Sequence, residues 1–508
     1  MSIATSNKHV VVIGAGIAGL SAASYLLRNG YRVTIMEQHS LPGGLCTSWK
    51  RKGYTIDYCI HWLMGTKEGT EFYHLWEELD AFTNADGSKV PIVNFDDFTT
   101  ITLSSGDTVT LSGNLKHLRA ELMRVGPEDE REIDSFCKSL KKMGAATEHD
   151  HLERLNPFSR AKRVFGSIGQ FVMVIKHLKS MEEFASRFKS PKLQELFLTE
   201  IPKSWSLIAL SMGLSQQPYK SAGYTVGGSL NIAQNIERRV RLLGGNIHYG
   251  TPVKRILVRE GEATGVLLDN GKSVGADHVI SAADGYTTLY HLLEGAYISK
   301  PYKEAYDRYP LFPSSVLVAL GIDGDYSHLP HTSSPYFDSP IQFPDGTSHN
   351  RFNLNVYHYD PTLSPPGKTL ITVLMNTWEG DKWELLATEE PKRYEEEKRR
   401  ISEEVIDRLE QLIGPISDRI EMVDTSTPHS VIRYTGNWQG SYEGFAPTRA
   451  TLSKRLPKTL PGLQNFSMIG QWTTPGGGLP TAAKDGLDIA KMLCKRDKKR
   501  FTSSFEQQ

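Results

Sequence analysis

The first apolar segments of the chain predict a strand, a helix and a second strand in close succession. His9–Ile13 is a run of β-branched residues, which is typical of a buried parallel strand. A helix is predicted over Ile17–Arg28, where the Asn29–Gly30 pair ends it. A second strand follows over Arg32–Met36. The chain therefore opens with a β-α-β unit.

Later patterns predict a larger mixed structure. Alternating residues and turn signals predict a hairpin over Thr99–Leu111 that turns at Ser105–Asp107, and a helical region follows over 115–214. A helix is predicted over Leu230–Leu243, and strands and hairpins are predicted over 247–284. Near the C-terminus, a strand over Phe466–Ile469 precedes a helix over Pro480–Leu493. Strands are also expected over Ser314–Asp323 and Thr369–Thr377. The charged segment Thr388–Gly414 predicts one helix with an apolar stripe of Ile401, Val405, Ile406, Leu409 and Leu412.

Composition narrows the class of protein. The 508 residues carry 58 Lys and Arg against 58 Asp and Glu, so nothing indicates a nucleic-acid partner. The four cysteines form no CxxC pair, which favours reduced thiols in a cytoplasmic protein and gives no metal site. No secretory signal is recognised, and no run reaches the ~18 apolar residues of a membrane-spanning helix. Residues 495–508 are expected to form a basic polar tail.

The turn of the opening unit carries the first candidate chemistry. Gly14, Gly16 and Gly19 follow the first strand with G-x-G-x-x-G spacing. This spacing allows a tight turn, close approach of a pyrophosphate and close helix packing, and the helix N-terminus then faces the phosphates. Glu37 ends the second strand, where a carboxylate binds the ribose of an adenosine and repels a 2′-phosphate. The unit predicts dinucleotide binding but does not separate FAD from NAD.

Two further glycine loops favour a flavin. The doublet Gly43–Gly44 allows close backbone approach of a cofactor that extends past the first turn. Near the C-terminus, a short strand leads to Gly470 and Gln471, and Pro475–Gly478 then precedes a helix that begins at about Pro480. A helix N-terminus here would face the flavin pyrimidine edge and stabilise negative charge on a reduced flavin.

These motifs resemble the phytoene desaturase, carotenoid isomerase and retinol saturase-like branch of the FAD-dependent amine oxidase superfamily. The resemblance rests on "VVVIGAGIAGLSAA", "PGGLCTS", "GYTIDYCIHWLMG", "ADHVISAAD", "RYTGNWQGSYEG" and "GQWTTPGGGLPTAAKDG" in family order. It implies non-covalent FAD, held by a set of residues that comprises Gly14, Gly16, Ile17, Ala18, Gly19, Glu37, Gln38, Gly43, Gly44, Leu45, Val253, Asp284, Gly470, Gln471, Gly477, Gly478, Leu479 and Pro480. Two positions depart from the pattern: Leu45 replaces the usual arginine, and Gln471 replaces an aspartate.

The resemblance also implies the fold, an α/β flavoprotein of the glutathione-reductase type. A Rossmann-type FAD-binding domain is expected over 8–90, 222–292 and 425–494. It is interleaved with a mixed α+β substrate domain over 91–221 and 293–424.

Few acid–base groups are expected, because the flavin itself carries hydride or electron transfer. The candidates are Asp57, His61, Arg433 and Tyr434. Asp57 is equally explained as a helix or turn cap. His61 could give a proton to a substrate carbon, although a lone histidine in an apolar stretch is commonly a core residue. Arg433 and Tyr434 are expected over the cleft, near Trp438, which a structural aromatic loop explains equally well.

The leading hypothesis is an FAD oxidoreductase for an apolar, conjugated or isoprenoid-like substrate. It would desaturate, saturate or isomerise carbon–carbon double bonds, with NAD(P) left open as an external electron donor or acceptor. An amine oxidase acting on a C–N bond and a non-catalytic flavin-bearing lipid-binding protein are the alternatives. Peripheral membrane contact through Phe165–Lys179 or Lys495–Arg500 remains open, as does the oligomeric state.

Overall fold

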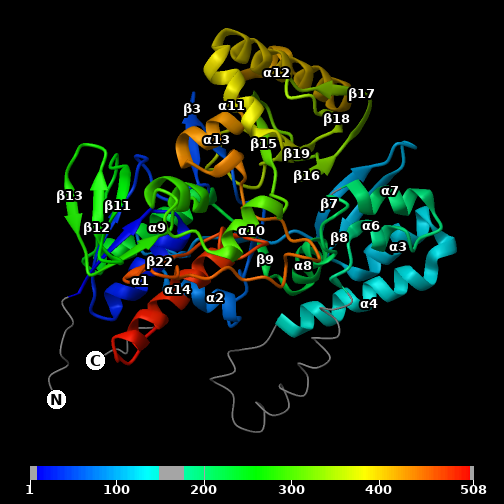
Figure 1. Ribbon diagram of the computed structural model, residues 1–508. Coiled ribbons are helices and arrows are strands. Elements are labelled where there is room, and N and C mark those ends of the chain that lie inside the picture. Colours follow the sequence, from blue (N-terminus) through cyan, green and yellow to red (C-terminus); the bar gives the residue numbers. More distant parts are fainter. Residues whose placement is uncertain (1–7, 148–176, 200, 504–508) are drawn as a thin grey trace, which may run out of the picture.

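The computed structural model describes residues 8–147, 177–199 and 201–503. A parallel sheet with its helices lies on one side of the molecule, and a larger mixed sheet lies beside it (Figure 1). A group of helices that includes α3, α4, α6 and α7 packs at the far end of the larger sheet. The chain passes between these parts several times, so residues distant in sequence meet at their junction.

The parallel sheet has five strands in the order β10-β2-β1-β14-β22. Its strands, in that order, are β10 (Asn246–His248), β2 (Arg32–Met36), β1 (His9–Ile13), β14 (His278–Ser281) and β22 (Phe466–Met468). Each neighbouring pair is parallel, and β1 and β14 are almost entirely buried. β-Branched residues suit such strands because both faces of a parallel sheet are covered.

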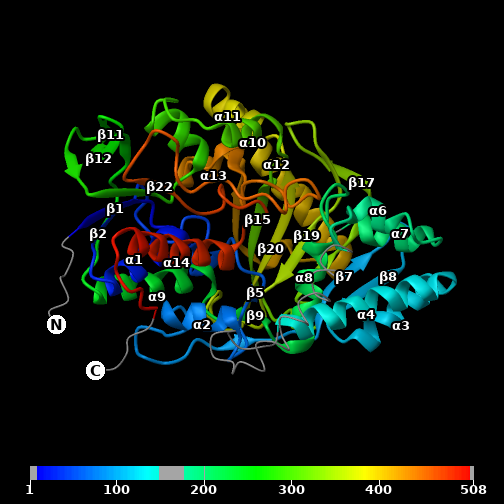
Figure 2. The same ribbon diagram turned by 60° about the horizontal axis from the view of Figure 1, so that its bottom comes forward.

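Three helices from separate parts of the chain lie side by side on this sheet (Figure 2). They are α1 (Ile17–Arg28), α9 (Gly228–Leu242) and α14 (Leu479–Arg496), and α2 (Glu71–Glu78) contacts α14. A Cβ at Gly486 of α14 would lie only 2.5 Å from the Ala22 nitrogen of α1. The glycine therefore allows the first and last helices of the described chain to pack in direct contact.

A small antiparallel sheet lies at the edge of this unit and consists of β11 (Val253–Arg259), β12 (Glu262–Leu268) and β13 (Ser273–Gly275). The two hairpins expected in this region are confirmed.

The larger sheet has seven strands in the order β21-β15-β20-β19-β16-β7-β8. In that order they are β21 (Ile420–Ser426), β15 (Ser314–Asp323), β20 (Lys368–Thr377), β19 (Asn353–Val356), β16 (Thr332–Ser334), β7 (Asp97–Thr102) and β8 (Thr108–Ser112). The two central strands β15 and β20 pair over ten residues each and are mostly buried. The expected hairpin of β7 and β8 is confirmed and joins this sheet through β16.

The expected helical region is confirmed over its described residues. It consists of α3 (Leu115–Val125), α4 (Glu130–Thr147), α6 (Met181–Ala185), α7 (Pro191–Thr199) and α8 (Ile208–Gln216). Phe136, Phe184, Phe188 and Phe197 form its aromatic core. Shorter elements complete the fold: β3 (Ser48–Arg51), β4 (Tyr54–Asp57), β5 (Leu63–Met64), β6 (Ile92–Val93), β9 (Ala222–Thr225), α10 (Lys300–Arg308), β17 (Tyr336–Gln342) and β18 (Ser348–Arg351).

The charged segment differs from its prediction as one helix. It contains the end of α11 (Gly380–Glu389) and the whole of α12 (Pro391–Ile413). Pro391 causes the break, because the residue before a proline is disfavoured in helical conformation, and Glu390 has φ −127° and ψ 57°. Ile401, Val405 and Leu409 are buried as expected, whereas Leu412 is 44% exposed in the last turn.

Candidate functional site

A cavity of about 840 Å³ lies where four strands of the parallel sheet end. Its lining includes residues just after β1, β2, β14 and β22, which is the edge at which open α/β sheets bind ligands. The other wall comes from α12, β21 and the helix α13 (Pro428–Thr435). The volume falls within the range of about 300–1,000 Å³ found for small-molecule and cofactor pockets.

The first glycine turn forms one end of this cavity. Gly14 has φ +98°, which favours glycine, and its N–H donates to the Met36 carbonyl at 2.8 Å. Gly19 lies behind the turn, where a Cβ would collide with the Gly14 carbonyl oxygen. Gly16 caps α1 without a side-chain hydrogen bond, so the first N–H groups of α1 remain available to an anion.

The glycine doublet lies against this turn. The Gly43 N–H donates to the Ala15 carbonyl at 2.9 Å, and Gly16 and Gly43 form a parallel bridge. Ile17, Ala18, Gly44 and Leu45 join them in lining the cavity.

Glu37 provides a buried carboxylate at the end of β2. Its Oε2 accepts the Ala15 N–H at 2.6 Å, and its Oε1 accepts the His39 N–H at 2.8 Å. Each carboxylate oxygen has a second lone pair, so both oxygens can still accept a ribose hydroxyl. Burial raises the pKa of Glu37, and the backbone donors oppose this shift.

The C-terminal loop forms another part of the cavity wall, beside the start of α1, where a Cβ at Gly470 would lie 3.6 Å from the Ala18 Cβ. Gly470, Gln471, Gly478 and Leu479 line the cavity. Asp485 of α14 holds the loop by accepting the Gly470 N–H at 3.1 Å and the Thr473 hydroxyl at 2.7 Å. Gly478 caps α14 without a side-chain hydrogen bond, which leaves a second helix N-terminus available at the cavity.

Gly477 and Pro480 lie behind this lining. Pro480 occupies the first turn of α14. A Cβ at Gly477 would lie 2.7 Å from the Glu443 carbonyl oxygen.

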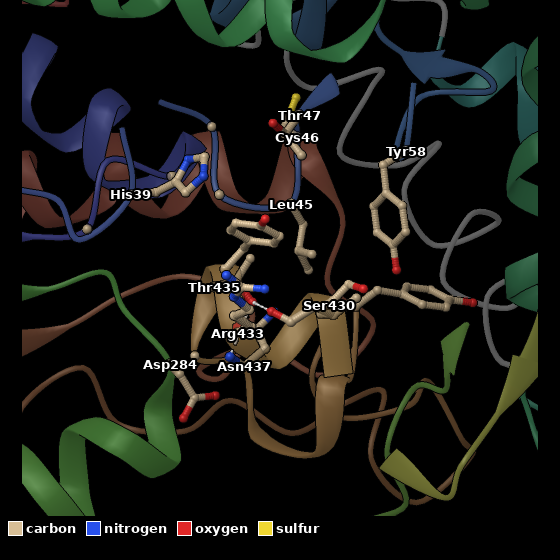
Figure 3. A pocket seen from close by; sticks show the side chains of 18 of the residues that line it. His39, Leu45, Cys46, Thr47, Tyr58, Asp284, Ser430, Arg433, Thr435 and Asn437 are labelled. Atoms are coloured by element: carbon tan, nitrogen blue, oxygen red, sulfur yellow. Dashed lines mark hydrogen bonds between the residues drawn. The ribbon is translucent and has the colours of Figure 1, made fainter. Parts of the chain in front are cut away.

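Helix α13 faces the glycine loops across the cavity, and Figure 3 shows Ser430, Arg433 and Thr435 on it opposite Leu45. The Gln38 side chain donates to the Tyr434 carbonyl at 3.3 Å, and the rings of His39 and Tyr434 meet edge to face at 5.3 Å. The Arg433 guanidinium lies 5.4 Å from the centre of the Tyr434 ring. Arg433 and Tyr434 are both exposed, so they stand at the mouth of the cavity.

Asp284 lines the cavity after β14 and fixes its neighbours. It accepts the Thr287 N–H at 2.7 Å and the Trp438 N–H at 3.0 Å, and burial raises its pKa to about 6. Trp438 stacks on Tyr286 at 4.9 Å between nearly parallel rings and does not line the cavity. Val253, the first residue of β11, lines the cavity as well.

Asp57 lies outside the cavity lining. It is fully buried at the start of α9, where it accepts the Ser229 N–H and the Ser229 hydroxyl, the latter at 2.6 Å. It also accepts the Cys59 N–H at 3.0 Å. These contacts are those of a helix cap, the alternative that the sequence left open.

His61 also lies outside the lining. Burial lowers its pKa to about 4, although part of its surface is accessible. The lowered pKa leaves the imidazole neutral at pH 7. Tyr357 is its hydrogen-bond partner, at 3.4 Å from Nδ1.

Several lining residues were not singled out from the sequence. They include Cys46, Thr47, Tyr58, Ser430, Thr435, Tyr442 and Glu443. Cys46 and Thr47 belong to "PGGLCTS" and Glu443 belongs to "NWQGSYEG". Their membership in these motifs could therefore have marked them as residues of the site. Tyr58 likewise belongs to "GYTIDYCIHWLMG", whereas nothing in the local pattern marked Ser430, because only the packing of separate segments brings it to the cavity.

Three findings concern the described part of the chain as a whole. No group of His, Cys, Asp and Glu in it could hold a metal ion. Among its helices, none is both long and apolar enough to cross a bilayer. Cys46, Cys59, Cys137 and Cys494 are free thiols.

The residues around the cavity fit a flavin dinucleotide. Two helix N-termini without side-chain caps suit the pyrophosphate and the electron-rich ring, and Glu37 suits the ribose of the adenosine. The close backbone approaches at Gly14, Gly43 and Gly470 leave room for such a ligand.

Comparison with known proteins agrees with this fit. The chain is 25% identical over 496 residues to a chloroplastic prolycopene isomerase of Daucus carota, covering 94% of this chain and 79% of the isomerase. It is 26% identical over 501 residues to a 4,4'-diapolycopene oxygenase of a Methylomonas species, covering 94% and 97% of the two chains.

Among solved structures, an oxidoreductase from Methanosarcina mazei matches with a TM-score of 0.61 and 19% identity, over 95% of this chain and 100% of the other. A putrescine oxidase variant matches with a TM-score of 0.62 and 15% identity, over 96% and 99%. At these identities the structural matches support the fold alone. The family described as flavin containing amine oxidoreductase matches residues 17–494, so the chain belongs to that family.

Proposed function

We propose that the chain is an FAD-dependent oxidoreductase that acts on carbon–carbon double bonds of an apolar, conjugated or isoprenoid-like substrate. The reaction is a desaturation, a saturation or an isomerisation that uses reduced flavin. The observation that carries the proposal is the cavity at the ends of four parallel strands, which is lined by glycine loops and by the buried carboxylate of Glu37. The substrate class is supported by the curated relatives, a prolycopene isomerase and a diapolycopene oxygenase, which match nearly the whole chain.

In this proposal FAD is bound without a covalent link. The N-terminus of α1 holds the pyrophosphate beside Gly14 and Gly16, Glu37 holds the ribose, and Val253 lies beside the adenine. The loop from Gly470 to Leu479 and the start of α14 hold the flavin end. When bound, FAD supplies hydride or electron transfer, and the protein orients it and excludes water.

Purified full-length protein tests the flavin assignment. Heat denaturation should release FAD that is identified by its mass, whereas release of FMN, of NAD alone or of no nucleotide would contradict the proposal. Gly16→Val should abolish flavin retention, because the new side chain would occupy the place of the pyrophosphate. Gly275→Val is the matched control, since Gly275 of β13 is exposed and a Cβ there would meet no atom closer than the Thr264 carbonyl oxygen at 3.9 Å.

The reduced protein tests the reaction class. After anaerobic reduction, addition of conjugated polyenes should reoxidise the flavin or isomerise the polyene, and chromatography would identify the product. If no polyene reoxidises the flavin, and if amines reduce the oxidised flavin, the result would favour an amine oxidase that acts on a C–N bond. NAD(P)H added without a polyene tests whether a nicotinamide donates the electrons.

The proposal extends to organisation and location. The flavin-binding domain comprises 8–90, 222–292 and 425–494, and the substrate domain comprises 91–221 and 293–424. The protein is cytoplasmic and contacts membranes at their surface, because an apolar polyene resides in the bilayer. Of the two segments considered for that contact, Phe165–Lys179 lies mostly outside the described residues.

A further inference from the structure

Glu443 is an acidic residue of the cavity that no step described so far uses. Its side chain lines the cavity beside Tyr442 and Gly478. Within the described ranges its carboxyl group has neither a hydrogen-bond donor nor an ion-pair partner. The other lining carboxylates, those of Glu37, Asp284, Glu395 and Asp424, all accept hydrogen bonds, so Glu443 is different from them.

The backbone around Glu443 is held firmly against the C-terminal glycine loop. Gly444 accepts the Phe312 N–H at 2.8 Å, and Phe445 accepts the Gly476 N–H at 2.9 Å. Gly477 packs directly on the Glu443 backbone, and a Cβ at Gly478 would lie 4.0 Å from Glu443 Oε1. The carboxyl group therefore lies at the start of α14, in the part of the cavity assigned to the flavin.

The surroundings keep this carboxyl group neutral. Burial raises the pKa of Glu443 to about 8. The segments packed against it, 310–313 and 471–479, contain no Asp, Glu, Lys, Arg or His. Tyr442 is the titratable neighbour, and its pKa is raised by burial first and by Glu443 second. A neutral carboxylic acid at pH 7 can donate a proton, which an ordinary glutamate cannot.

We propose that Glu443 exchanges the proton that accompanies hydride transfer between flavin and substrate, an inference that rests on the proposed function. In the saturating direction, reduced flavin gives a hydride to one carbon of a double bond and Glu443 gives its proton to the other. The products are a C–C single bond, oxidised flavin and a carboxylate that regains its proton from water. In the desaturating direction the carboxylate takes the proton while the hydride passes to the flavin.

The pH dependence of the flavin midpoint potential tests this inference without any substrate. Reduction adds negative charge to the ring, which raises the pKa of a nearby carboxyl group. The carboxyl group thus has one pKa beside oxidised flavin and a higher pKa beside reduced flavin. At a pH between these two values, it takes up one additional proton for each pair of electrons that the flavin accepts. The flavin-loaded full-length protein should therefore show a steeper potential-against-pH segment that begins near pH 8. Glu443→Gln should lose this segment, and Glu443→Asp should keep it at a shifted pH.

Glu395→Gln is the matched control, because Glu395 also lines the cavity but is exposed and paired with Lys398. This variant should keep the steeper segment. Equal pH dependence in the wild type and Glu443→Gln, or loss of the segment in Glu395→Gln, would overturn the inference. Glu443→Gln should also slow hydride transfer to a polyene by about 10²–10⁴-fold.

The two proposals fail separately. A flavin whose potential depends on Glu443 in a protein inert to every polyene would contradict the substrate class only. Turnover of a polyene with no effect of Glu443 on the potential or the rate would contradict the role of Glu443 only.

Discussion

Glu37 is the residue on which the adenosine half of the site depends. Glu37→Ala removes the acceptor for the ribose hydroxyls and leaves the buried Ala15 N–H without its partner. We expect FAD binding to weaken by roughly 1–3 kcal/mol, as for hydrogen bonds to a charged group. Equilibrium titration of the flavin-free wild type and variant with FAD measures the two affinities. The melting midpoint of the flavin-free variant shows how much of the weaker binding comes from a less stable fold. An unchanged affinity would mean that the ribose lies elsewhere.

Arg433 offers a cation to the same ligand. Three lysine and arginine side chains line the cavity, and two of them have carboxylate partners: Arg51 with Asp424 and Lys398 with Glu395. In the part of the chain that the structure describes, Arg433 has none, and it lies opposite Leu45 (Figure 3). The position that carries arginine in the resembling family is thus apolar, and Arg433 can supply the charge for the pyrophosphate from α13.

We therefore expect Arg433→Ala to weaken FAD binding by roughly 1.5–3 kcal/mol, less at high salt because Arg433 is exposed. Lys398→Ala is the control and should leave the affinity unchanged. If Arg433→Ala lowers turnover and keeps the FAD affinity, the catalytic assignment of Arg433 is favoured instead.

At the scale of elements, Asp57 ties β4 to the start of α9. Its carboxyl group is completely buried, and burial raises its pKa to about 6 against an ordinary value of 3.8. A carboxyl group whose pKa is higher in the folded state contributes stability below pH 4 and loses it as pH rises through 6. The difference between these two pKa values corresponds to roughly 2–3 kcal/mol in the free energy of unfolding.

Asp57→Asn should therefore be less stable than the wild type at pH 4, and this difference should shrink as pH rises to 7. Melting midpoints across this range measure the effect, with Asp407→Asn on the exposed face of α12 as the control. A difference that does not change with pH would contradict the assigned protonation. A loss of turnover without any change in stability would restore the catalytic assignment of Asp57.

At the scale of the whole molecule, the expected basic tail is partly docked. Lys499 donates to the Asn29 carbonyl at 2.9 Å, and Arg496 contacts Asp497 and His278. Lys495, Lys498 and Arg500 remain exposed. These three residues therefore form the basic surface that could meet an anionic membrane.

We expect the protein to float with anionic liposomes at low salt and to sediment at high salt. Each basic residue near the surface should contribute about 1 kcal/mol to the free energy of membrane binding. Changing Lys495, Lys498 and Arg500 to glutamine should abolish flotation, and Lys484→Gln, on an exposed turn of the same helix, should not. Sedimentation of the wild type at both salt concentrations would contradict the tail as a contact. Flotation at both would favour the segment Phe165–Lys179.

The sequence by itself determined the features that depend on neighbouring residues. The strand–turn–helix of Gly14–Gly19, the carboxylate at Glu37 and the hairpin of β7 and β8 follow from local rules of periodicity, backbone freedom and turn chemistry, and all are observed. Most residues expected at the cofactor line the cavity for the same reason, since they belong to short motifs.

Only the tertiary structure decided which distant side chains share a surface. It packs α13 and Glu443, more than 380 residues after Gly44 in the chain, against the glycine loops, and it turns Asp57 toward α9 instead of the cavity. It also separates α11 from α12 and docks the C-terminal residues on α1. Burial and the pKa values of Glu443 and His61 depend on every element packed around them, so no local pattern of residues could determine them.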